Sequence, residues 1–345
     1  MSTIKKVAEL AGVSIATVSN VLTGSVRVSK RLQEKVENAI RELDYHPNHI
    51  ARSLKTSRTR ILGVIVPDMT IPFFPRIIRG AETAALQRKY SLIAANSDDS
   101  SQRQAELLAL LRSQRVEGIL MVLAAGTAPT AQMSRILEAG IPMVCLDRIP
   151  DGIAMDSVSV DNADASEMGV SHLLSMGHTE IAIVTGPLSL RNEQERLQGY
   201  RIAFRKAGLR PDDSMVWEGN FRPPDVAEMC CEHLRSGRRL PSAIFATNGP
   251  TGLGVLRALR TCHLVTPGNI GFATFDELTA EDLFSPIVTT VVQPAFDIGF
   301  RGAEILLDRL HEDVGASDPI QIQIRLPASL KIGDSSRLNT QAAGG

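Results

Sequence analysis

The first sixty residues constrain the fold most, because short amphipathic helices and turn residues alternate within them. Apolar side chains at helical spacing predict a helix over residues 4–11, and Gly12 stands where a tight turn needs positive φ. Ser14 is expected to cap a second helix over residues 15–22, since its hydroxyl can accept from the free amides of the first turn. Two short helices joined by such a turn are typical of a helix-turn-helix domain that reads DNA.

The outer face of the second helix is expected to meet base edges in the major groove. Asn20 can form paired hydrogen bonds to adenine, and Ile15 or Ala16 can pack on a thymine methyl group. The residues of the head that we expect to contact DNA are Thr3, Ser14, Ile15, Ala16, Thr17, Ser19 and Asn20.

A third helix and a basic connector follow. Ser29 is expected to cap a helix from Lys30 to Leu43. Asn48 stands where it can cap a short helix, Ile50 to Lys55, within a linker over residues 48–60.

Charge is distributed unevenly along the 345-residue chain, whose net charge is −1. Residues 1–60 hold 11 Lys and Arg against 5 Asp and Glu, a net of +6, so the remainder carries −7. A basic head on an acidic body indicates that only the head meets a polyanion. The other interpretation is a solvated basic tail, which the regular helical pattern of the head disfavours.

A series of motifs runs through almost the whole chain. It begins with Ile4-Lys-Lys-Val-Ala-Glu-Leu-Ala-Gly-Val-Ser-Ile-Ala-Thr-Val-Ser and continues with Val28-Ser29, Tyr45-His-Pro-Asn48, Ala51-Arg-Ser-Leu-Lys55, Ile61-Leu-Gly-Val-Ile-Val-Pro-Asp68, Pro72-Phe-Phe74, Asp147-Arg148, Gly177-His178, Arg196-Leu-Gln-Gly199 and Thr289-Thr290. In this order the motifs resemble the lactose/galactose repressor (LacI/GalR) family of bacterial transcriptional regulators.

The resemblance implies that the linker is a hinge helix, which folds only on specific DNA. Leu54 would there enter the minor groove and wedge apart a central base step. The hinge residues expected at DNA are Asn48, Ala51, Leu54 and Lys55. The other interpretation is that Leu54 packs within the head.

Beyond the linker, short apolar runs alternate with amphipathic helices, which argues for parallel sheets wound on both faces. The predicted strands are Ile61–Val66, Ser91–Ala95, Gly118–Val122, Pro142–Leu146, Ser157–Val160, Ile181–Thr185, Ala243–Ala246, Gly271–Phe275 and Thr289–Val292. The predicted helices are 74–89, 102–114, 129–139, 164–176, 191–207, 224–236 and 249–261. This series is too long for one sheet, so we expect two similar doubly wound α/β lobes.

The resemblance implies a body of periplasmic-binding-protein type, in which the chain crosses between lobes near 161–163, 290–292 and 324–327. The expected divisions are a helix-turn-helix domain over 1–47, a hinge and linker over 48–60, and an effector-binding and dimerisation domain over 61–332. Lobe 1 would hold about 61–161 and 291–325, and lobe 2 about 162–290 and 326–332. The polar tail, 333–345, is expected to be disordered, and it holds no leucine heptad that would build a tetramer.

In open α/β sheets, ligands bind beyond the carboxyl ends of the strands, and between two lobes this edge becomes a cleft. Carboxylates, amides and arginines that follow the predicted strands can bind hydroxyl or carboxylate groups there, and phenylalanines can stack on a ring. The expected effector-binding residues are Phe73, Phe74, Asp98, Asp147, Arg148, Arg191, Arg196, Phe221, Asn248 and Asp276. The resemblance points most consistently to Arg196, Asn248 and Asp276.

Other interpretations stay open for some of these residues. Asp98 and its neighbour Asp99 can instead cap the helix near residue 102, Arg148 can form a surface ion pair, and Phe74 can belong to the core alone. Gly249 follows Asn248 where many members of the family have aspartate, so no particular sugar specificity is carried over.

The sequence carries no H-E-x-x-H motif, no P-loop, no G-x-S-x-G elbow and no spaced Cys/His metal cluster, so we expect neither an enzyme nor a cofactor. No apolar run approaches the ~18 residues of a membrane span. The four cysteines are expected to be reduced in a cytoplasmic protein, since none is spaced as a C-x-x-C pair.

We therefore expect a transcriptional regulator, a repressor as the resemblance implies, that binds a near-palindromic double-stranded operator as a homodimer. Its expected effector is a small, carbohydrate-like molecule, and its expected dimer contact includes Ile77, Ile78 and Ala81 of helix 74–89. The alternative is a sugar-binding protein or sugar-active enzyme with an incidental basic head. The absence of an apolar export signal disfavours a periplasmic binding protein, and the DNA-reading head disfavours an enzyme.

Overall fold

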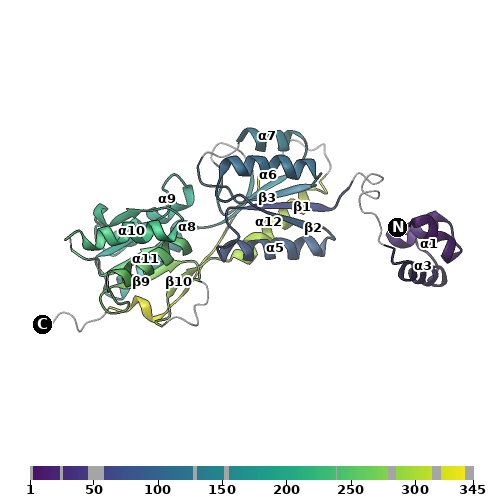
Figure 1. Ribbon diagram of the computed structural model, residues 1–345. Helices are drawn as coiled ribbons and strands as arrows, with labels where there is room; N and C mark the ends of the chain where they lie inside the picture. Colours follow the sequence, from purple (N-terminus) through teal and green to yellow (C-terminus); the bar gives the residue numbers. More distant parts are fainter. Residues whose placement is uncertain are drawn as a thin grey trace. The chain divides into compact units, whose positions relative to one another are not determined.

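The computed structural model describes residues 3–23, 26–45, 58–126, 130–150, 155–237, 239–278, 285–312 and 320–338. The chain divides into two compact units, Met1–Thr59 and Arg60–Gly345 (Figure 1). The first unit is helical, and the second is built on parallel sheets covered by helices. The predicted fold class, an all-α head and a doubly wound α/β body of two lobes, is confirmed.

The described part of the head holds α1 at Ile4–Ala11, α2 at Ile15–Thr23 and α3 at Lys30–Glu42. Each helix turns an apolar stripe toward the other two, as the helical spacing of these residues predicts. The buried side chains that they share are Val7, Ala8, Ala11, Val18, Val36 and Ala39.

The turn between α1 and α2 has the predicted chemistry. Gly12 ends α1 in the left-handed region with a φ of 63°, where a side chain would cost energy. Ser14 caps α2, because its hydroxyl accepts a hydrogen bond from the amide of Thr17 at 3.1 Å. Ser29 is the N-cap residue of α3, as predicted, but its side chain makes no capping hydrogen bond.

In the described part of the body, lobe 1 is built on a six-stranded sheet whose neighbouring strands are all parallel. The strand order is β11-β5-β4-β3-β1-β2, with β1 at Ile61–Val66, β2 at Ser91–Asn96, β3 at Gly118–Met121, β4 at Met143–Leu146, β5 at Asp156–Val160 and β11 at Gln323–Leu326. Its helices are α5 at Phe73–Gln87, α6 at Ser101–Ser113, α7 at Thr130–Glu138 and α12 at Ala295–Arg309. In Figure 1, α6 and α7 lie on one face of this sheet and α5 and α12 on the other, so the central strands are buried on both sides.

Lobe 2 repeats this plan, again with a six-stranded sheet among the described residues. The strand order is β12-β10-β9-β8-β6-β7, with β6 at Ile181–Thr185, β7 at Val216–Glu218, β8 at Ala243–Ala246, β9 at Gly271–Phe275, β10 at Thr289–Val292 and β12 at Ser329–Lys331. Its helices are α8 at Asn162–Ser175, α9 at Arg191–Lys206, α10 at Pro223–Arg235 and α11 at Gly249–Thr261, with short 3-10 turns η1 at Asp213–Met215 and η3 at Asp334–Ser336. Among the described strands of this sheet, only β12 runs antiparallel to its neighbour, β10.

The described chain passes between the lobes from β5 to α8, from β10 to α12 and from β11 to β12. The second passage follows Val292, because all of β10 pairs within the sheet of lobe 2. Residues 291–292 therefore belong to lobe 2, and Leu326, the last residue of β11, belongs to lobe 1. Both lobe boundaries differ from the predicted ones by one or two residues.

Helices α5 and α12 pack with their backbones close together. Gly80 faces the carbonyl of Phe296, and Gly299 faces the carbonyl of Ile77, so a side chain at either glycine would collide with backbone. Ile77 and Ala81 are fully buried in this packing. The predicted dimer contact through these two residues is therefore wrong, because they face the core of their own lobe.

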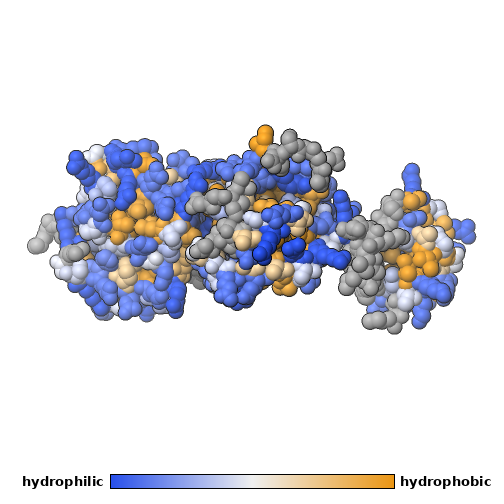
Figure 2. Space-filling model, turned by 90° about the horizontal axis from the view of Figure 1, so that it is seen from above, coloured by the Kyte–Doolittle hydropathy of each residue, from blue (hydrophilic) through white to orange (hydrophobic). Residues whose placement is uncertain are grey.

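The strand β2 forms one edge of the lobe 1 sheet and leaves apolar surface open. Ile93 is 38% exposed, Ala94 is exposed as well, and the nearby Leu86, at the end of α5, is 59% exposed. Elsewhere the face shown in Figure 2 is mostly hydrophilic, with hydrophobic residues in separate patches. An open apolar sheet edge is a surface that other chains can pair with.

The predicted disorder of the tail is wrong for its first part. The Ser335 hydroxyl donates to the carbonyl of Phe272 at 2.6 Å, and the Ser336 hydroxyl lies 2.8 Å from Nε2 of His172. Both serines are almost fully buried, so they tie η3 to the sheet of lobe 2. Residues 339–345 lie outside the described residues.

Candidate DNA-contact surface and ligand pocket

The N-terminal end of α2 presents side chains of the predicted kind. Ile15 is 48% exposed and Ala16 is exposed, while Thr17, Ser19 and Asn20 are half-buried along the same helix. Thr3 caps α1 through a hydrogen bond from the amide of Lys6 to its hydroxyl, at 3.4 Å, and thus has a structural role of its own. The predicted hinge residues Asn48, Ala51, Leu54 and Lys55 lie outside the described residues.

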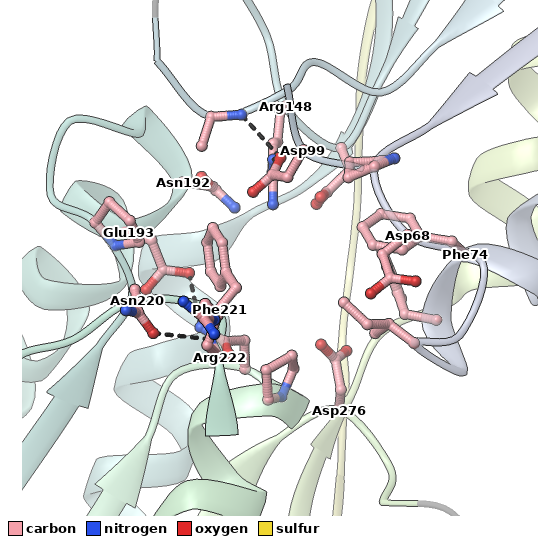
Figure 3. A pocket seen from close by; sticks show the side chains of 18 of the residues that line it. Asp68, Phe74, Asp99, Arg148, Asn192, Glu193, Asn220, Phe221, Arg222 and Asp276 are labelled. Carbon is pink, nitrogen blue, oxygen red and sulfur yellow. Dashed lines mark hydrogen bonds and ion pairs between the residues drawn. The ribbon is translucent and has the colours of Figure 1, made fainter. Parts of the chain in front are cut away.

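A pocket of about 500 Å³ lies in the second unit, where loops of both lobes meet. Its walls come from the segments that follow the strands, as the position of ligand sites in parallel sheets predicts. Figure 3 shows Asp68 and Phe74 on one side, Glu193 and Phe221 on the other, and the open space between them. The polar and aromatic residues of the wall are Asp68, Thr70, Phe73, Phe74, Asp98, Asp99, Asp147, Arg148, Asn192, Glu193, Arg196, Asn220, Phe221, Arg222, Asn248, Asp276 and Gln293.

One part of the wall is a buried ion pair on α9, between Arg196 and Glu193. Arg196 donates through Nη1 to Glu193 at 3.1 Å and to the carbonyl of Thr247 at 2.7 Å, and through Nε to Asn162 at 2.9 Å. Glu193 also accepts from the side chain of Asn248 at 3.3 Å. Because neither charge reaches water, these hydrogen bonds are needed to compensate the cost of burial. They fix α9 against the loop that follows β8.

A second cluster joins the two lobes. Arg148, which follows β4 in lobe 1, donates to Asp99 at 2.6 Å and to the carbonyl of Leu123 at 2.9 Å. Its guanidinium lies 4.8 Å from the ring centroid of Phe221, which follows β7 in lobe 2. A cation on an aromatic face is attracted to it, so this contact favours the observed spacing of the lobes.

Two aspartates face the same space from opposite lobes, the buried Asp147 and the partly buried Asp276. Asp147 follows β4, and Asp276 follows β9, with φ of 59° and 66°, a left-handed conformation that aspartate tolerates better than most residues. Burial raises the pKa of Asp276 to about 6, although Arg196 and a hydrogen bond from Gln293 lower it. Burial also raises the pKa of Asp147. Strained backbone and raised pKa values are features of functional sites.

Nine of the ten predicted effector residues line this pocket, namely Phe73, Phe74, Asp98, Asp147, Arg148, Arg196, Phe221, Asn248 and Asp276. Arg191 is not among the lining residues, and its Nε instead donates to Glu195 at 3.1 Å on the exposed side of α9. Asp98 and Asp99 do not cap α6, because the hydroxyl of Ser100 does. Arg148 is almost fully buried, so its pairing with Asp99 is not a surface ion pair.

The pocket wall also holds Asn192, Glu193 and Gln293, which were not predicted from sequence. Helical periodicity could have predicted Asn192 and Glu193, because residues 192, 193 and 196 lie on one face of α9, which turns away from Arg191. Gln293 follows β10 directly, and the rule that ligands bind after the strands would have found it.

The described residues hold no group of three His, Cys, Asp or Glu side chains that could bind a metal ion. Cys145 and Cys230 are free and buried, and burial raises the pKa of each thiol to about 12. His178 is buried, and its Nε2 lies 3.0 Å from the carbonyl of Ser336, so it is a core histidine. No helix in the described part of the chain is long and apolar enough to cross a membrane.

Comparisons with known proteins extend over the whole chain. Residues 59–330 match the family of periplasmic binding proteins and sugar binding domain of LacI family, and residues 3–48 match bacterial regulatory proteins, lacI family. The HTH-type transcriptional repressor PurR of Vibrio campbellii is 34% identical over 314 residues, which are 90% of this chain and 93% of that protein. The ribose operon repressor of Escherichia coli is 32% identical over 322 residues, 93% of this chain and 97% of that protein. A crystal structure of the Lac repressor dimer bound to operator and the anti-inducer ONPF has a TM-score of 0.83 at 25% identity, covering 97% of this chain and 99% of that one.

Proposed function

The chain belongs to the LacI family of bacterial regulatory proteins and is a DNA-binding transcriptional regulator, and we propose that it is a repressor whose operator affinity depends on a sugar-like molecule bound between its two lobes. The observation that carries the proposal is the pocket itself. Loops of both lobes line it, so a ligand there contacts both and favours one arrangement of the lobes over another. Such coupling typically changes affinity at a distant site by about 5–150-fold.

The polar wall supports a ligand rich in hydroxyl groups. Carboxylates and amides from several strand ends converge on it, and Phe73 and Phe221 add flat apolar surface. Sugars combine hydroxyl groups with an apolar ring face, and therefore match such a wall. We place the protein in the cytoplasm, where the DNA that it regulates is found.

We also propose a homodimer that binds a near-palindromic operator, because the two-fold symmetry of a dimer is mirrored in its site. The apolar edge strand β2, with Ile93 and Ala94, is the surface that we assign to the dimer contact in place of Ile77 and Ala81. Base contacts are assigned to Ile15, Ala16, Thr17, Ser19 and Asn20, with Asn48, Ala51, Leu54 and Lys55 as hinge contacts predicted from sequence.

Selection of the full-length protein on random duplex DNA, followed by sequencing of the bound pool, tests the DNA side of the proposal. An enriched palindrome is the expected result. Operator affinity is then measured with and without a metabolite extract, for the wild type and for Phe221→Ala, whose ring forms part of the pocket wall. Affinity that changes for the wild type alone supports control through the pocket. An extract that leaves the affinity of the wild type unchanged, or changes both proteins equally, contradicts it.

A further inference from the structure

Within the part of the chain that the structure describes, the pocket presents acceptor oxygens that receive no hydrogen bond. Among the described residues, buried side-chain atoms without a hydrogen-bond partner include Oδ1 of Asp147, Oδ1 of Asn192 and Oε1 of Gln293, and all three residues line the pocket. The amide of Gln293 has a fixed orientation, because its nitrogen donates to Asp276 at 2.7 Å. Its oxygen is therefore an acceptor, as is the carboxylate oxygen Oδ1 of Asp147. Buried acceptors of this kind are normally satisfied, so a ligand that donates hydrogen bonds is the missing partner.

The described wall of the pocket also has more acids than bases. Asp147 and Glu193 are buried and Asp276 is partly buried around the guanidinium of Arg196, while the second buried guanidinium, that of Arg148, pairs with Asp99. Glu193 already takes a hydrogen bond from that guanidinium, and Asp276 takes one from Gln293. Asp147 has neighbouring positive charge but no hydrogen bond to its Oδ1.

The other arginines of the wall do not reverse this balance. Arg148 is committed to Asp99 at 2.6 Å, and the exposed Arg222 lies 3.5 Å from Asp225. Asp68 and Asp98 add further carboxylates at the rim. An anionic ligand would place a further negative group beside the carboxylates of Asp147, Glu193 and Asp276, which like-charge repulsion and desolvation oppose.

We propose that this pocket selects ligands that donate hydrogen bonds through hydroxyl or ammonium groups and carry no phosphate or carboxylate. The inference rests on the proposed function, and it narrows the effector to a chemical class. Asp147 belongs to lobe 1, while Asn192 and Gln293 follow strands of lobe 2. One donor-rich molecule that satisfies all three oxygens thus spans the cleft, whereas a phosphorylated form of the same molecule is rejected.

The test uses a bacterial metabolite extract that ion-exchange columns have separated into anionic, neutral and cationic fractions. The full-length protein is incubated with each fraction, freed of unbound compounds by gel filtration and denatured, and the released molecules are identified by mass spectrometry. We expect the captured compound in the neutral or the cationic fraction, which distinguishes hydroxyl from ammonium donors. Capture from the anionic fraction is expected to be at least tenfold lower.

Variants show whether these acceptor oxygens are the reason that the compound is captured. Asp147→Asn is expected to reduce capture at least tenfold, because an amide nitrogen replaces one acceptor oxygen. Asp308→Asn is the matched control, since Asp308 lies on α12 with its side chain 62% exposed, and it is expected to capture as the wild type does.

A captured compound that carries phosphate or carboxylate overturns the inference and leaves the proposed function intact. Equal capture by the wild type and Asp147→Asn also overturns it. If no fraction yields a captured compound, the proposed function fails, and the inference fails with it.

Discussion

Asp276→Asn is expected to stabilise the ligand-free protein, although the residue lines the pocket. Burial raises the pKa of Asp276 from its ordinary 3.8 to about 6, so the folded state holds this carboxylate at a cost above that pH. The shift corresponds to about 3 kcal/mol at neutral pH. Asparagine is uncharged, tolerates the left-handed φ of 66° at this position, and keeps an oxygen that can accept from Gln293. We expect a gain of about 1–3 kcal/mol in the free energy of unfolding at pH 7.5.

The dependence of this gain on pH identifies its cause. Between pH 3.8 and about 6 the folded wild type holds more protons than the unfolded chain, so rising pH through this window removes stability from the wild type. The advantage of Asp276→Asn should therefore shrink as the pH falls from 7.5 and vanish near pH 4. Urea unfolding of both proteins at several pH values measures it, with Asp308→Asn, at an exposed aspartate, as a control expected to stay within about 0.5 kcal/mol. A variant that is less stable than the wild type by the same amount at every pH would refute the reasoning.

Three further sites and one pH dependence give the remaining predictions. Ligand capture should fall about tenfold between pH 7.5 and pH 5, because the carboxylate of Asp276, whose pKa is raised to about 6 and which faces Arg196, Asp147 and Glu193, becomes protonated; equilibrium dialysis of the captured compound measures this, and constant affinity would contradict it. Asn20→Ala should relax base preference at one position per half-site in the DNA selection, and an unchanged motif would exclude that residue as a reader. Gly299→Ala should destabilise the body by about 1–3 kcal/mol in urea unfolding, because the added methyl group meets facing backbone, and unchanged stability would contradict the close packing of α5 and α12. Ile93→Asp should shift the protein toward monomer in sedimentation experiments, whereas an unchanged mass would remove β2 from the dimer contact.

Much of the fold could be predicted from sequence, because it depends on the local chemistry of the chain. Gly12 and Ser14 define the turn of the head because each satisfies a requirement of the backbone at that position. Continuous apolar runs such as Ile61–Val66 indicate strands buried on both faces, and their alternation with helices indicates a parallel sheet. Strands that lack this pattern escaped prediction: β11 alternates between exposed and half-buried residues at the edge of its sheet, and β7 is only three residues long.

The sequence by itself determined the helical head, the two α/β lobes and the strand ends that bear polar side chains, because these depend on spacing along the chain. Only the tertiary structure decided which of those side chains share a space. Arg191 and Arg196 are five residues apart on one helix, yet one faces solvent and the other lies in the buried centre of the pocket. Tertiary packing also brought Glu193 to Asn248, and among the described residues it left acceptor oxygens from both lobes without donors. Which partners a side chain lacks depends on every segment packed around it, and those segments are far apart in sequence.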